Sequence, residues 1–353
     1  MKPYARTGRK EQYYTSDQDE FQVFDQGGRG MVKVGIVGAT GLVGDKMISV
    51  LQESSLSISE LRLFASAKST GRTINFRGLP HAVEIIQNDS WEKGMIILGA
   101  TSSETARQWI PDALNAGAYI IDNSSAYRMD RDVPLVVPEI NRGAIKSHHR
   151  LIANPNCSTI QLVMALGPLR SIAPFEWVSV TTYQSVSGSG RDGIAALNRQ
   201  EEKSPEVGSF HRNIICEIGS TEPSGYTGEE IKLVMETPKI LEVNFPVFPA
   251  CARVPVVTGH TESVTIKFSK NVTAGKVRQR LEEASGVQVS DLGCQPVAVE
   301  GTNHTVVGRI RNHPMDQSVI QFWVTADNVR KGAALNAVQI LELLVAQQTT
   351  GPA

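Results

Sequence analysis

The sequence predicts an α/β protein of two domains, the first built on a parallel sheet and the second of the α+β class. Its 353 residues are enough for two packed cores. Up to residue 156, short apolar segments alternate with helical segments, the pattern of parallel strands joined by crossover helices. After residue 157 the strand-like segments become longer and alternate in polarity, which is typical of antiparallel strands with helices on one face.

The first domain is expected to span residues 31–156 and to be completed by the C-terminal segment 328–350. The second domain is expected to span residues 157–327. The hydrophobic pattern predicts the individual elements. Strands are predicted at 32–37, 61–65, 95–98, 119–122, 178–184, 263–268, 304–311 and 318–325, and helices at 42–51, 105–115, 160–169, 190–203, 274–284 and 328–346.

Residues 1–30 differ from the rest of the chain. They are polar, mix charges of both signs and end in a glycine-rich stretch. This composition predicts a flexible leader, and the clear strand after Met31 makes that residue an alternative start. A transit peptide fits less well because acidic residues cluster at 17–20. An artificial extension stays open as well.

Composition and charge argue against several classes of function. The formal net charge of -1 gives no reason to expect nucleic-acid or membrane-surface binding. No apolar run approaches the ~18 residues of a membrane span, and the N-terminus lacks the apolar region of a secretory signal. The 4 cysteines are scattered without CxxC spacing, so no zinc site, redox pair or other metal site is predicted. A reducing, cytoplasmic setting is expected.

A glycine-rich turn follows the first predicted strand and opens the first predicted helix. Glycines let a backbone approach a pyrophosphate closely, and a helix N-terminus offers it free N–H groups. The turn therefore predicts dinucleotide binding in a Rossmann-like domain, against the simpler interpretation of a tight strand–helix connection. The residues predicted to bind the cofactor here are Gly38, Thr40, Gly41, Leu42, Val43 and Gly44.

The end of the second predicted strand favours NADP over NAD. A site for NAD would carry an acidic residue there to bind the ribose hydroxyls. This chain has instead Ser66, Lys68, Ser69 and Thr70, whose hydroxyls and charge suit a 2′-phosphate. A solvated surface loop is the alternative.

Cys157 is the candidate nucleophile. Pro155 and Asn156 mark a turn and an N-cap, so Cys157 falls on the first turn of the helix predicted at 160–169. A helix N-terminus stabilises a thiolate, and we therefore expect a lowered thiol pKa. The other cysteines are expected to be small buried hydrophobic residues.

The segment 253–260 contains a candidate base and a candidate anion clamp. It is predicted to be an extended, proline-containing strand with Arg253 at one end and His260 at the other. Gly259 would give His260 room. A structural histidine is the alternative, and the spacing alone does not decide between them.

Six blocks of sequence, taken in order, resemble aspartate-β-semialdehyde dehydrogenases of the bacterial type. The resemblance covers almost the whole chain after the leader. It implies an N-terminal NADP-binding domain and a C-terminal domain like that of glyceraldehyde-3-phosphate dehydrogenase. The blocks are GATGLVG (38–44), DNSSAYR (122–128), VPLVVPEIN (133–141), NPNCSTIQ (154–161), TYQSVSGSG (182–190) and RVPVVTGH (253–260).

The resemblance implies NADPH-dependent reduction of L-aspartyl-4-phosphate to L-aspartate-4-semialdehyde. This step serves the biosynthesis of lysine through diaminopimelate, and of threonine, methionine and isoleucine. By the same resemblance Cys157 forms the acyl thioester, Gln184 orients the substrate and His260 is the acid/base. The remaining roles implied are α-carboxylate binding by Arg253, ammonium and phosphate binding by Glu229 and Lys232, phosphate binding by Arg128 and Asn156, and nicotinamide contacts by Ser187, Gly188 and Asn328.

The charges of that substrate agree with these residue types. Its two anionic groups need cations and its ammonium needs a carboxylate, and the planar fork of arginine suits a carboxylate. Glu229 and Lys232 are three residues apart, so on a helix they share one face. Without the resemblance, a solvated surface ion pair would be the preferred interpretation.

Two other enzyme families and one protein without catalytic activity are the alternatives to this function. N-acetyl-γ-glutamyl-phosphate reductase has the same architecture, but its acetylated amine does not need an acid such as Glu229. Glyceraldehyde-3-phosphate dehydrogenase surrounds its cysteine with a different motif. A catalytically silent binding module would be expected to lose Cys157 or its partners. The loop 99–103, which is rich in hydroxyls, departs from the family pattern and leaves its own role open.

The long antiparallel strands of the second domain are of a kind that supports sheet-to-sheet contact between subunits. The family resemblance implies a homodimer or a homotetramer. Apart from other copies of the chain, only small-molecule partners are expected.

Overall fold

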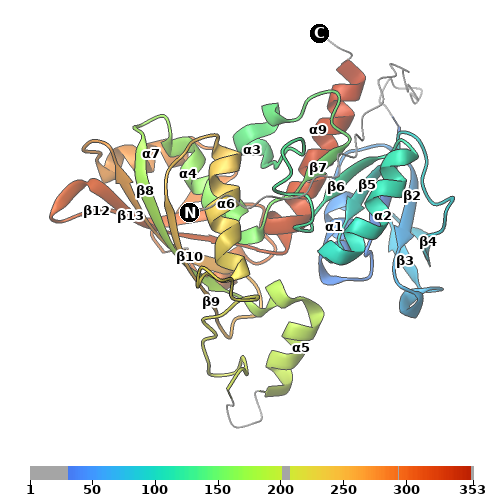
Figure 1. The fold of residues 1–353 in the computed structure, drawn as a ribbon, viewed down its shortest axis with the longest axis horizontal. Coiled ribbons are helices and arrows are strands. Elements are labelled where there is room, and N and C mark those ends of the chain that lie inside the picture. The colour runs from blue at the N-terminus through green and yellow to red at the C-terminus, as the bar shows by residue number, and fades with distance from the viewer. Residues whose placement is uncertain (1–30, 201–206, 293, 351–353) are drawn as a thin grey trace.

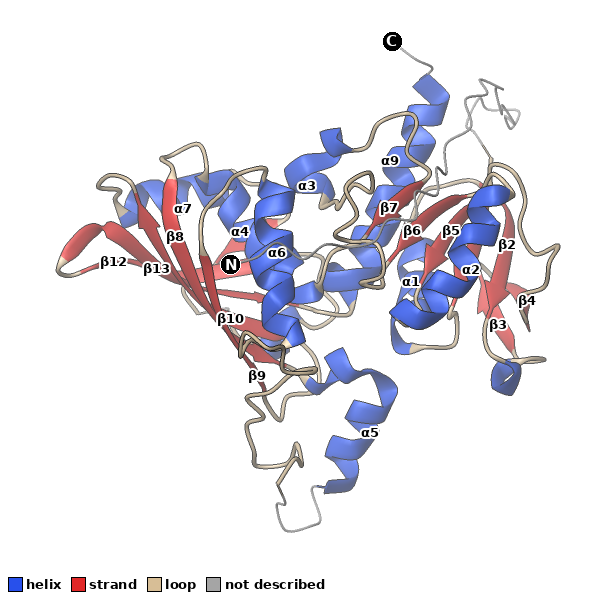
Figure 2. Cartoon of the chain, viewed as in Figure 1, coloured by secondary structure: helices blue, strands red, loops and turns tan. Residues whose placement is uncertain are grey.

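The computed structural model describes residues 31–200, 207–292 and 294–350. They form two sheets, each packed against helices, so the predicted fold class is confirmed (Figures 1 and 2). The predicted leader and the last residues of the predicted helix 190–203 lie outside the described residues.

The first sheet has seven strands in the order β3-β4-β2-β1-β5-β6-β7. All neighbours run parallel except β3 and β4, which form an antiparallel hairpin. β5 is buried along its whole length, as expected of a parallel strand covered on both faces. The strands are β1 (Val32–Val37), β2 (Ile58–Phe64), β3 (Thr73–Phe76), β4 (Leu79–Glu84), β5 (Ile96–Gly99), β6 (Tyr119–Asp122) and β7 (Leu151–Ala153).

Helices cover both faces of this sheet. On one face α1 (Leu42–Glu53) and α9 (Asn336–Thr350) share a buried cluster that includes Met47 of α1 and Leu341 of α9. On the other face α2 (Ser103–Asn115) contributes Trp109 to a second cluster. The C-terminal helix therefore returns to the first sheet, where Figure 1 shows it in red beside the green and blue strands.

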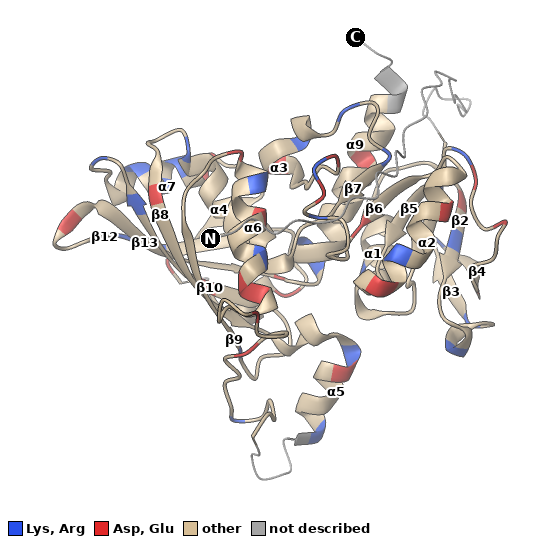
Figure 3. Cartoon of the chain, in the orientation of Figure 1, with Lys and Arg blue, Asp and Glu red and all other residues tan. Residues whose placement is uncertain are grey.

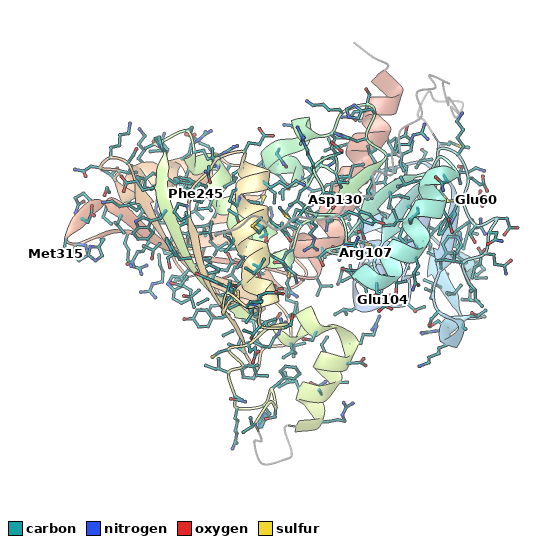
Figure 4. The ribbon with its side chains drawn as sticks, viewed as in Figure 1. Glu60, Glu104, Arg107, Asp130, Phe245 and Met315 are labelled. Carbon is teal, nitrogen blue, oxygen red and sulfur yellow. The ribbon has the colours of Figure 1, made fainter. Side chains whose placement is uncertain are left out.

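The second sheet has six strands in the order β11-β12-β13-β10-β8-β9. Most neighbours are antiparallel, whereas β9 runs parallel to β8, and β11 runs parallel to β12. Figure 4 labels Met315 at the tip of the long β12–β13 hairpin. The strands are β8 (Phe175–Gln184), β9 (Val247–Arg253), β10 (His260–Phe268), β11 (Val287–Val289), β12 (Thr305–His313) and β13 (Asp316–Ala326).

The two faces of the second sheet differ in burial. Alternate residues of β8, from Val178 to Gln184, are buried on the face that we call inner. This face packs against the helical layer of α4 (Cys157–Leu169), α6 (Gly228–Leu241) and α7 (Ala274–Glu282). The opposite face, which we call outer, carries the partly exposed Trp177 and Tyr183. Catalytic candidates at the ends of β8 and β10 therefore point toward the helical layer.

Shorter elements connect these layers. The helix α5 (Gly190–Gln200) projects away from both sheets in Figure 1, and Arg191 links it to Asp45 of α1 at 3.0 Å. The other short elements are the 3-10 turns η1 (Ala67–Ser69), η2 (Arg142–Ala144) and η3 (Val186–Ser189), the short helices α3 (Pro138–Asn141) and α8 (Pro296–Val299), and the π-helical segment η4 (Arg330–Leu335).

Two predicted elements differ from the structure. The segment 253–260 is not one strand, because β9 ends at Arg253 and β10 begins at His260. Pro255 has no N–H for a ladder and Gly259 has a φ of 94°, so the chain loops across the end of β8 instead. The predicted helix 328–346 also starts differently, as the π-helical turn η4 that precedes α9.

Candidate active site

Five residues meet where the inner face of the second sheet reaches the N-terminus of α4. We call Cys157, Gln184, Glu229, Arg253 and His260 the catalytic cluster. They come from the start of α4, the end of β8, the first turn of α6, the end of β9 and the start of β10. All five were singled out in the sequence, and contacts described below tie them together.

Cys157 is the first residue of α4, as predicted. Asn156 is the N-cap, and its Oδ1 accepts hydrogen bonds from the N–H groups of Ser158 and Thr159 at 3.0 and 3.2 Å. The Cys157 side chain is partly buried against the π-helical segment. A Cβ atom at Gly332 would lie 2.9 Å from Cβ of Cys157, so only glycine fits there without a shift.

The expectation of a lowered thiol pKa is wrong. Burial, followed by the negative charge of Glu229, raises the pKa of the Cys157 thiol to about 11. The positive charges of Arg253, Lys232 and Arg128 act in the opposite direction. Burial and the neighbouring carboxylate are thus the two causes that raise this pKa.

Gln184 connects the nucleophile's helix to both charged partners. Its Nε2 donates to Oγ of Ser158 at 2.9 Å and to Oε1 of Glu229 at 3.1 Å. Its Oε1 accepts from Nη1 of Arg253 at 3.2 Å. The side chain is 1% exposed, so its orientation is fixed by these bonds.

Glu229 and Lys232 share one face of α6, as predicted. A capping box formed by Thr227 and Glu230 starts this helix, and Lys232 bonds to Oε2 of Glu229 at 2.8 Å. Burial opposes the ionisation of Glu229 and would raise its pKa. The charge and hydrogen bond of Lys232 act against burial, as do hydrogen bonds from Asn156 and Gln184. Together they lower the pKa of Glu229 to about 2. Glu229 is therefore a buried carboxylate. Figure 3 shows residues of both charges along α6.

Arg253 lies against backbone that only glycine allows. Its Nη1 donates to the carbonyl of Ser185 at 2.8 Å, in addition to the bond to Gln184. A Cβ atom at Gly188 would lie 2.5 Å from this Nη1. Arg253 is 7% exposed, so the site contains a buried cation. Among the described residues only its Nη1 is hydrogen-bonded to protein, which leaves the rest of the donor fork for a ligand.

His260 is fully buried at the start of β10. Its Nδ1 accepts a hydrogen bond from the N–H of Ser185 at 3.0 Å, whereas its Nε2 has no partner among the described residues. Burial, and next the charge of Arg253, lowers the pKa of His260 to about 3, with Glu229 acting against them. The ring is therefore neutral.

Arg128 donates three hydrogen bonds to protein groups around the turn that precedes Cys157. It donates to Asn154 O at 2.9 Å, to Asn123 O at 2.7 Å and to Oε1 of Glu236 at 2.9 Å. Glu236 also accepts from the N–H of Asn156 at 2.8 Å. Arg128 thus holds the turn that presents Cys157, and its phosphate-binding role stays a prediction.

The glycine-rich turn forms a tight cradle at the N-terminus of α1. Gly38 has a φ of 84°, and a Cβ atom there would lie 2.4 Å from Ala100 O. A Cβ atom at Gly44 would lie 2.2 Å from Gly38 O. Gly41 is the N-cap and makes no side-chain cap, which leaves N–H groups of the first turn for a ligand. This geometry fits a pyrophosphate.

The predicted 2′-phosphate residues lie beside that cradle. Thr40 Oγ1 and Ser69 Oγ are 3.1 Å apart, which joins the glycine-rich turn to η1. Ser66, Lys68 and Thr70 are exposed around η1, and Lys68 lies within it. These positions fit an anionic group beside the adenosine end of a dinucleotide.

The residues predicted to contact nicotinamide are brought together near the start of β10. Asn328 is 3% exposed, and its Oδ1 accepts from Oγ of Ser187, Oγ of Ser185 and N of Gly259 at 3.2, 3.0 and 2.9 Å. Gly188 follows in η3. Asn328 thus joins Ser185, Ser187 and Gly259 to one another, and its contact with nicotinamide stays a prediction.

Sequence analysis missed several residues that hold the site. Ser185 contacts His260 and Asn328, Ser158 holds Gln184, and Glu236 pairs with Arg128. Ser185 and Ser158 stand next to predicted residues inside two family blocks, which was the available signal. Nothing in the local sequence marks Glu236.

In the part of the chain that the structure describes, no three His, Cys, Asp or Glu side chains are grouped to hold a metal ion. Nor does any helix of residues 31–200, 207–292 or 294–350 have the length and apolar character to cross a membrane.

Comparison with protein families gives two matches along the chain. Residues 33–148 match the family description "Semialdehyde dehydrogenase, NAD binding domain". Residues 166–331 match "Semialdehyde dehydrogenase, dimerisation domain". Together the matches cover all strands of the second sheet and those of the first sheet except β7 and the first residue of β1.

Individual proteins agree with this assignment. Aspartate-semialdehyde dehydrogenase 2 of Vibrio cholerae is 43% identical over 88% of this chain and 97% of the relative. The crystal structure of aspartate semialdehyde dehydrogenase II from Vibrio cholerae complexed with ASA has a TM-score of 0.86 and 42% identity, and covers 90% of this chain and 99% of that one. The Candida albicans enzyme with NADP has a TM-score of 0.71 and 26% identity, over 89% and 98%.

Proposed function

This chain is an oxidoreductase of the aspartate-semialdehyde dehydrogenase family, and from that premise we propose that it reduces L-aspartyl-4-phosphate to L-aspartate-4-semialdehyde through a thioester on Cys157. The observation that supports this function most strongly is a thiol at a helix N-terminus, in one cluster with a buried carboxylate and a buried arginine. The reaction serves lysine, threonine, methionine and isoleucine biosynthesis.

Each charged arm of the substrate has a counterpart in the cluster. The ionised Glu229 suits the ammonium, and the fork of Arg253 suits the α-carboxylate. Lys232, with its side chain 34% exposed, suits the phosphate together with Asn156 and Arg128. The buried carboxylate favours a free amine, because an ammonium adds a second cation to Glu229 beside Lys232, whereas an acetylated amine carries no charge.

Substrate binding would also activate the thiol. Glu229 is one of the groups that raise the Cys157 pKa, and an ammonium held against it cancels that effect. The sulfur then attacks the acyl carbon, the C–S bond forms and the C–O bond to phosphate breaks, with the thiol proton leaving on phosphate. When bound, NADPH supplies the hydride that reduces the thioester. N–H groups at the start of α4 and His260 are placed to stabilise the charge on the carbonyl oxygen.

We infer that the cofactor is NADP, with its pyrophosphate in the cradle of Gly38, Gly41 and Gly44 and its 2′-phosphate near Lys68. The support is the absence of an acidic residue from the described segment 65–72 and the link of Thr40 to Ser69. Replacing Lys68 by alanine should raise the KM for NADP about tenfold and leave that for NAD unchanged, as expected for one lost charged hydrogen bond. Equal effects on both cofactors would contradict this assignment.

We propose a homodimer formed through the outer face of the second sheet, with a homotetramer as its possible extension. Tyr183 and Trp323 stack there with ring centroids 5.8 Å apart. Beside them is an open hollow of about 420 Å³, lined mostly by apolar groups. Partly exposed aromatic residues on a sheet face are typical of subunit interfaces. Its lining includes Tyr183, Thr261, Cys294, Pro296, Arg309 and Trp323.

We further propose a cytoplasmic location. All 4 cysteines are free, and the nucleophile requires a reduced thiol, which a reducing compartment maintains.

The activity is tested in the oxidative direction with aspartate semialdehyde, NADP and inorganic phosphate. We expect NADPH formation that depends on phosphate and is lost in Cys157→Ser, whereas NADP binding by that variant is retained. Turnover with only the N-acetylglutamyl aldehyde would instead assign the chain to the N-acetyl-γ-glutamyl-phosphate reductases. Near-normal turnover by Cys157→Ser would exclude the thioester.

A further inference from the structure

An ion pair joins the second domain to the helix that opens the proposed cofactor cradle. Nη2 of Arg191, at the start of α5, lies 3.0 Å from Oδ2 of Asp45, in the first turn of α1. Both side chains are largely exposed, at 55% and 60%. The turn η3, which contains Ser187 and Gly188, comes directly before α5. The pair therefore connects the pyrophosphate side of the proposed cofactor site to its nicotinamide side.

Asp45 is close to the place proposed for the pyrophosphate. Its backbone N–H closes the first turn of α1 by donating to the carbonyl of Gly41 at 3.0 Å. Gly41 is the N-cap, so Asp45 lies four residues further, about 6 Å along the helix axis. When no other anion is present, a carboxylate there complements the positive end of the helix. A pyrophosphate bound at the same end would be repelled by that carboxylate.

A second ion pair of α1 is held much more firmly. Arg330 of η4 donates from Nη1 to Oε1 of Glu53 at 3.0 Å and from Nη2 to Oε2, and its Nε donates to Asn303 at 2.6 Å. Arg330 is 7% exposed, so this contact is fixed. Arg191 lacks such support, because among the described residues Asp45 is its only hydrogen-bond partner, through one nitrogen. The pair at the start of α1 is therefore able to exchange partners.

A phosphate group is a stronger partner for the guanidinium of Arg191 than Asp45 is. An exposed ion pair between two side chains contributes little, because water and salt screen the charges and both side chains lose freedom. Phosphate oxygens accept parallel hydrogen bonds from the planar fork of arginine, and such bonds are short and strong. A pyrophosphate would already be held by N–H groups at the start of α1, so only the side chain of Arg191 has to turn.

We propose that Arg191 is a further cofactor-binding residue, which pairs with Asp45 in the free protein and turns to the pyrophosphate when a dinucleotide binds. Asp45 keeps the arginine beside the cradle and competes with the ligand for it. This inference rests on the proposed function, because it takes the glycine-rich turn as the pyrophosphate site. NADP and NAD share the pyrophosphate, so Arg191 contributes to the binding of both, whereas Lys68 is proposed for the 2′-phosphate alone.

The first test is the Kd of the full-length protein for NADP and for NAD, measured by titration calorimetry. Arg191→Ala should raise both values about tenfold, as expected for the loss of one hydrogen bond between charged groups. The matched control is Arg199→Ala, which removes an exposed arginine from the last turn of the same helix and should leave both values unchanged. Adenosine 2′-phosphate, which has no pyrophosphate, should bind Arg191→Ala and the parent equally. Unchanged Kd values for both dinucleotides in Arg191→Ala would overturn the proposal.

The second test is Asp45→Asn, because the direction of its effect separates a partner exchange from a fixed link between the domains. If Asp45 competes for Arg191 and repels the pyrophosphate, removal of its charge should lower both Kd values about threefold, the size of one screened surface interaction. If the pair is only a fixed link, Asp45→Asn and Arg191→Ala break the same contact and both should weaken binding. Weaker or unchanged binding by Asp45→Asn would therefore reject the exchange.

The same titrations separate this inference from the function on which it rests. A parent protein that binds neither dinucleotide would refute the proposed cofactor, and the role of Arg191 with it. A parent that binds NADP no better than Arg191→Ala does would refute the role of Arg191 alone. Thermal unfolding of the variants should match that of the parent, because an exposed ion pair contributes little stability. A change in Kd then reports on the binding site and not on the fold.

Discussion

At residue 188 the catalytic cluster leaves no room for a side chain, because Gly188 packs directly against Arg253. Nη1 of Arg253 is held between Oε1 of Gln184 at 3.2 Å and the carbonyl of Ser185 at 2.8 Å. A Cβ atom at residue 188 would lie 2.5 Å from it. Arg253 therefore cannot keep both bonds beside any residue larger than glycine.

Gly188→Ala should raise the KM for aspartate semialdehyde about tenfold, the effect of weakening one hydrogen bond of a charged group. Gly275→Ala is the matched control, because a Cβ atom at residue 275 meets nothing within 4 Å. Steady-state kinetics of both variants measure the difference. Unchanged substrate KM in Gly188→Ala would show that Arg253 does not hold the substrate carboxylate.

A second buried acid lies two residues beyond His260 on the same face of β10. Glu262 is completely buried, and neither carboxyl oxygen has a hydrogen-bond partner by distance and angle among the described residues. Burial raises the pKa of Glu262 well above its usual value, and the side chain of Gln161 in α4 acts in the opposite direction. The folded protein thus keeps this carboxyl protonated where the unfolded chain would ionise it.

The sign of the resulting pH dependence follows from proton counts. Above the ordinary carboxyl pKa the folded state holds a proton that the unfolded state has lost, so stability falls as pH rises. Glu262→Gln keeps the shape and removes this cost, so it should raise the free energy of unfolding more at pH 8 than at pH 5. Urea unfolding at both pH values measures this. The exposed Glu176→Gln should give no such difference, and an equal effect of Glu262→Gln at both pH values would contradict a protonated Glu262.

At the scale of elements, strands with a clear hydrophobic pattern could be predicted from the sequence. The irregular segments that connect helices and strands could not. β1 and β6 match their predicted bounds because short, continuous apolar runs mark parallel strands. The β3–β4 hairpin was missed because it is short and largely exposed, and only its tight turn at Arg77 and Gly78, both with positive φ, marks it. The segment 253–260 was wrongly predicted to be one extended, proline-containing strand, because residue types alone do not reveal where the hydrogen bonds of a sheet end.

The candidate site could be predicted as a set of residues but not as an arrangement. Cys157, Gln184, Arg253 and His260 were singled out from blocks of sequence, and the structure brings them together. The thiol pKa was predicted in the wrong direction because burial and the charge of Glu229 depend on packing across α4 and α6. Ser185 was missed because its role depends on Asn328, far away in sequence.

The π-helical segment η4 is secured by an ion pair in the core. Lys331 is completely buried, and its Nζ lies 2.8 Å from Oε1 of Glu139, at the start of α3. Gln339 of α9 accepts from the same Nζ at 3.0 Å. These bonds join η4, which packs on Cys157 through Gly332, to α3 and α9.

Lys331→Met should lower the free energy of unfolding by about 3–5 kcal/mol, because it leaves the carboxylate of Glu139 buried without its cation. Adding Glu139→Gln should recover much of that loss. Denaturant unfolding measures both, with the exposed Lys276→Met as the control. A loss no larger than that of Lys276→Met would mean that the pair does not secure η4.

At the scale of the whole molecule, the two sheets serve different purposes. The first sheet is covered by helices on both faces, whereas the second has helices on its inner face and partly exposed aromatic residues on its outer one. Cys157 begins α4 between them, so cofactor and substrate can approach it from different domains. The outer face is then left for the proposed contact with a second copy of the chain.

Trp177→Glu should convert the proposed dimer to monomers, because it places a charge on the outer face. Trp177 lies near the start of β8, whereas Gln184 is the last residue of this strand, so the catalytic cluster is not changed directly. Met315→Glu is the matched control, since Met315 is 88% exposed at the tip of the β12–β13 hairpin. Sedimentation of the two variants gives their masses. A dimeric Trp177→Glu protein would place the interface elsewhere.

The central claim is that Cys157 carries the acyl group, and trapping the acyl-enzyme tests it most directly. The protein is incubated with aspartate semialdehyde and NADP without phosphate, and its peptides are analysed by mass spectrometry. We predict an aspartyl thioester on the peptide that contains Cys157, which phosphate removes and which Cys157→Ser never forms. No adduct, or one on another residue, in a protein that turns over with phosphate would contradict the account.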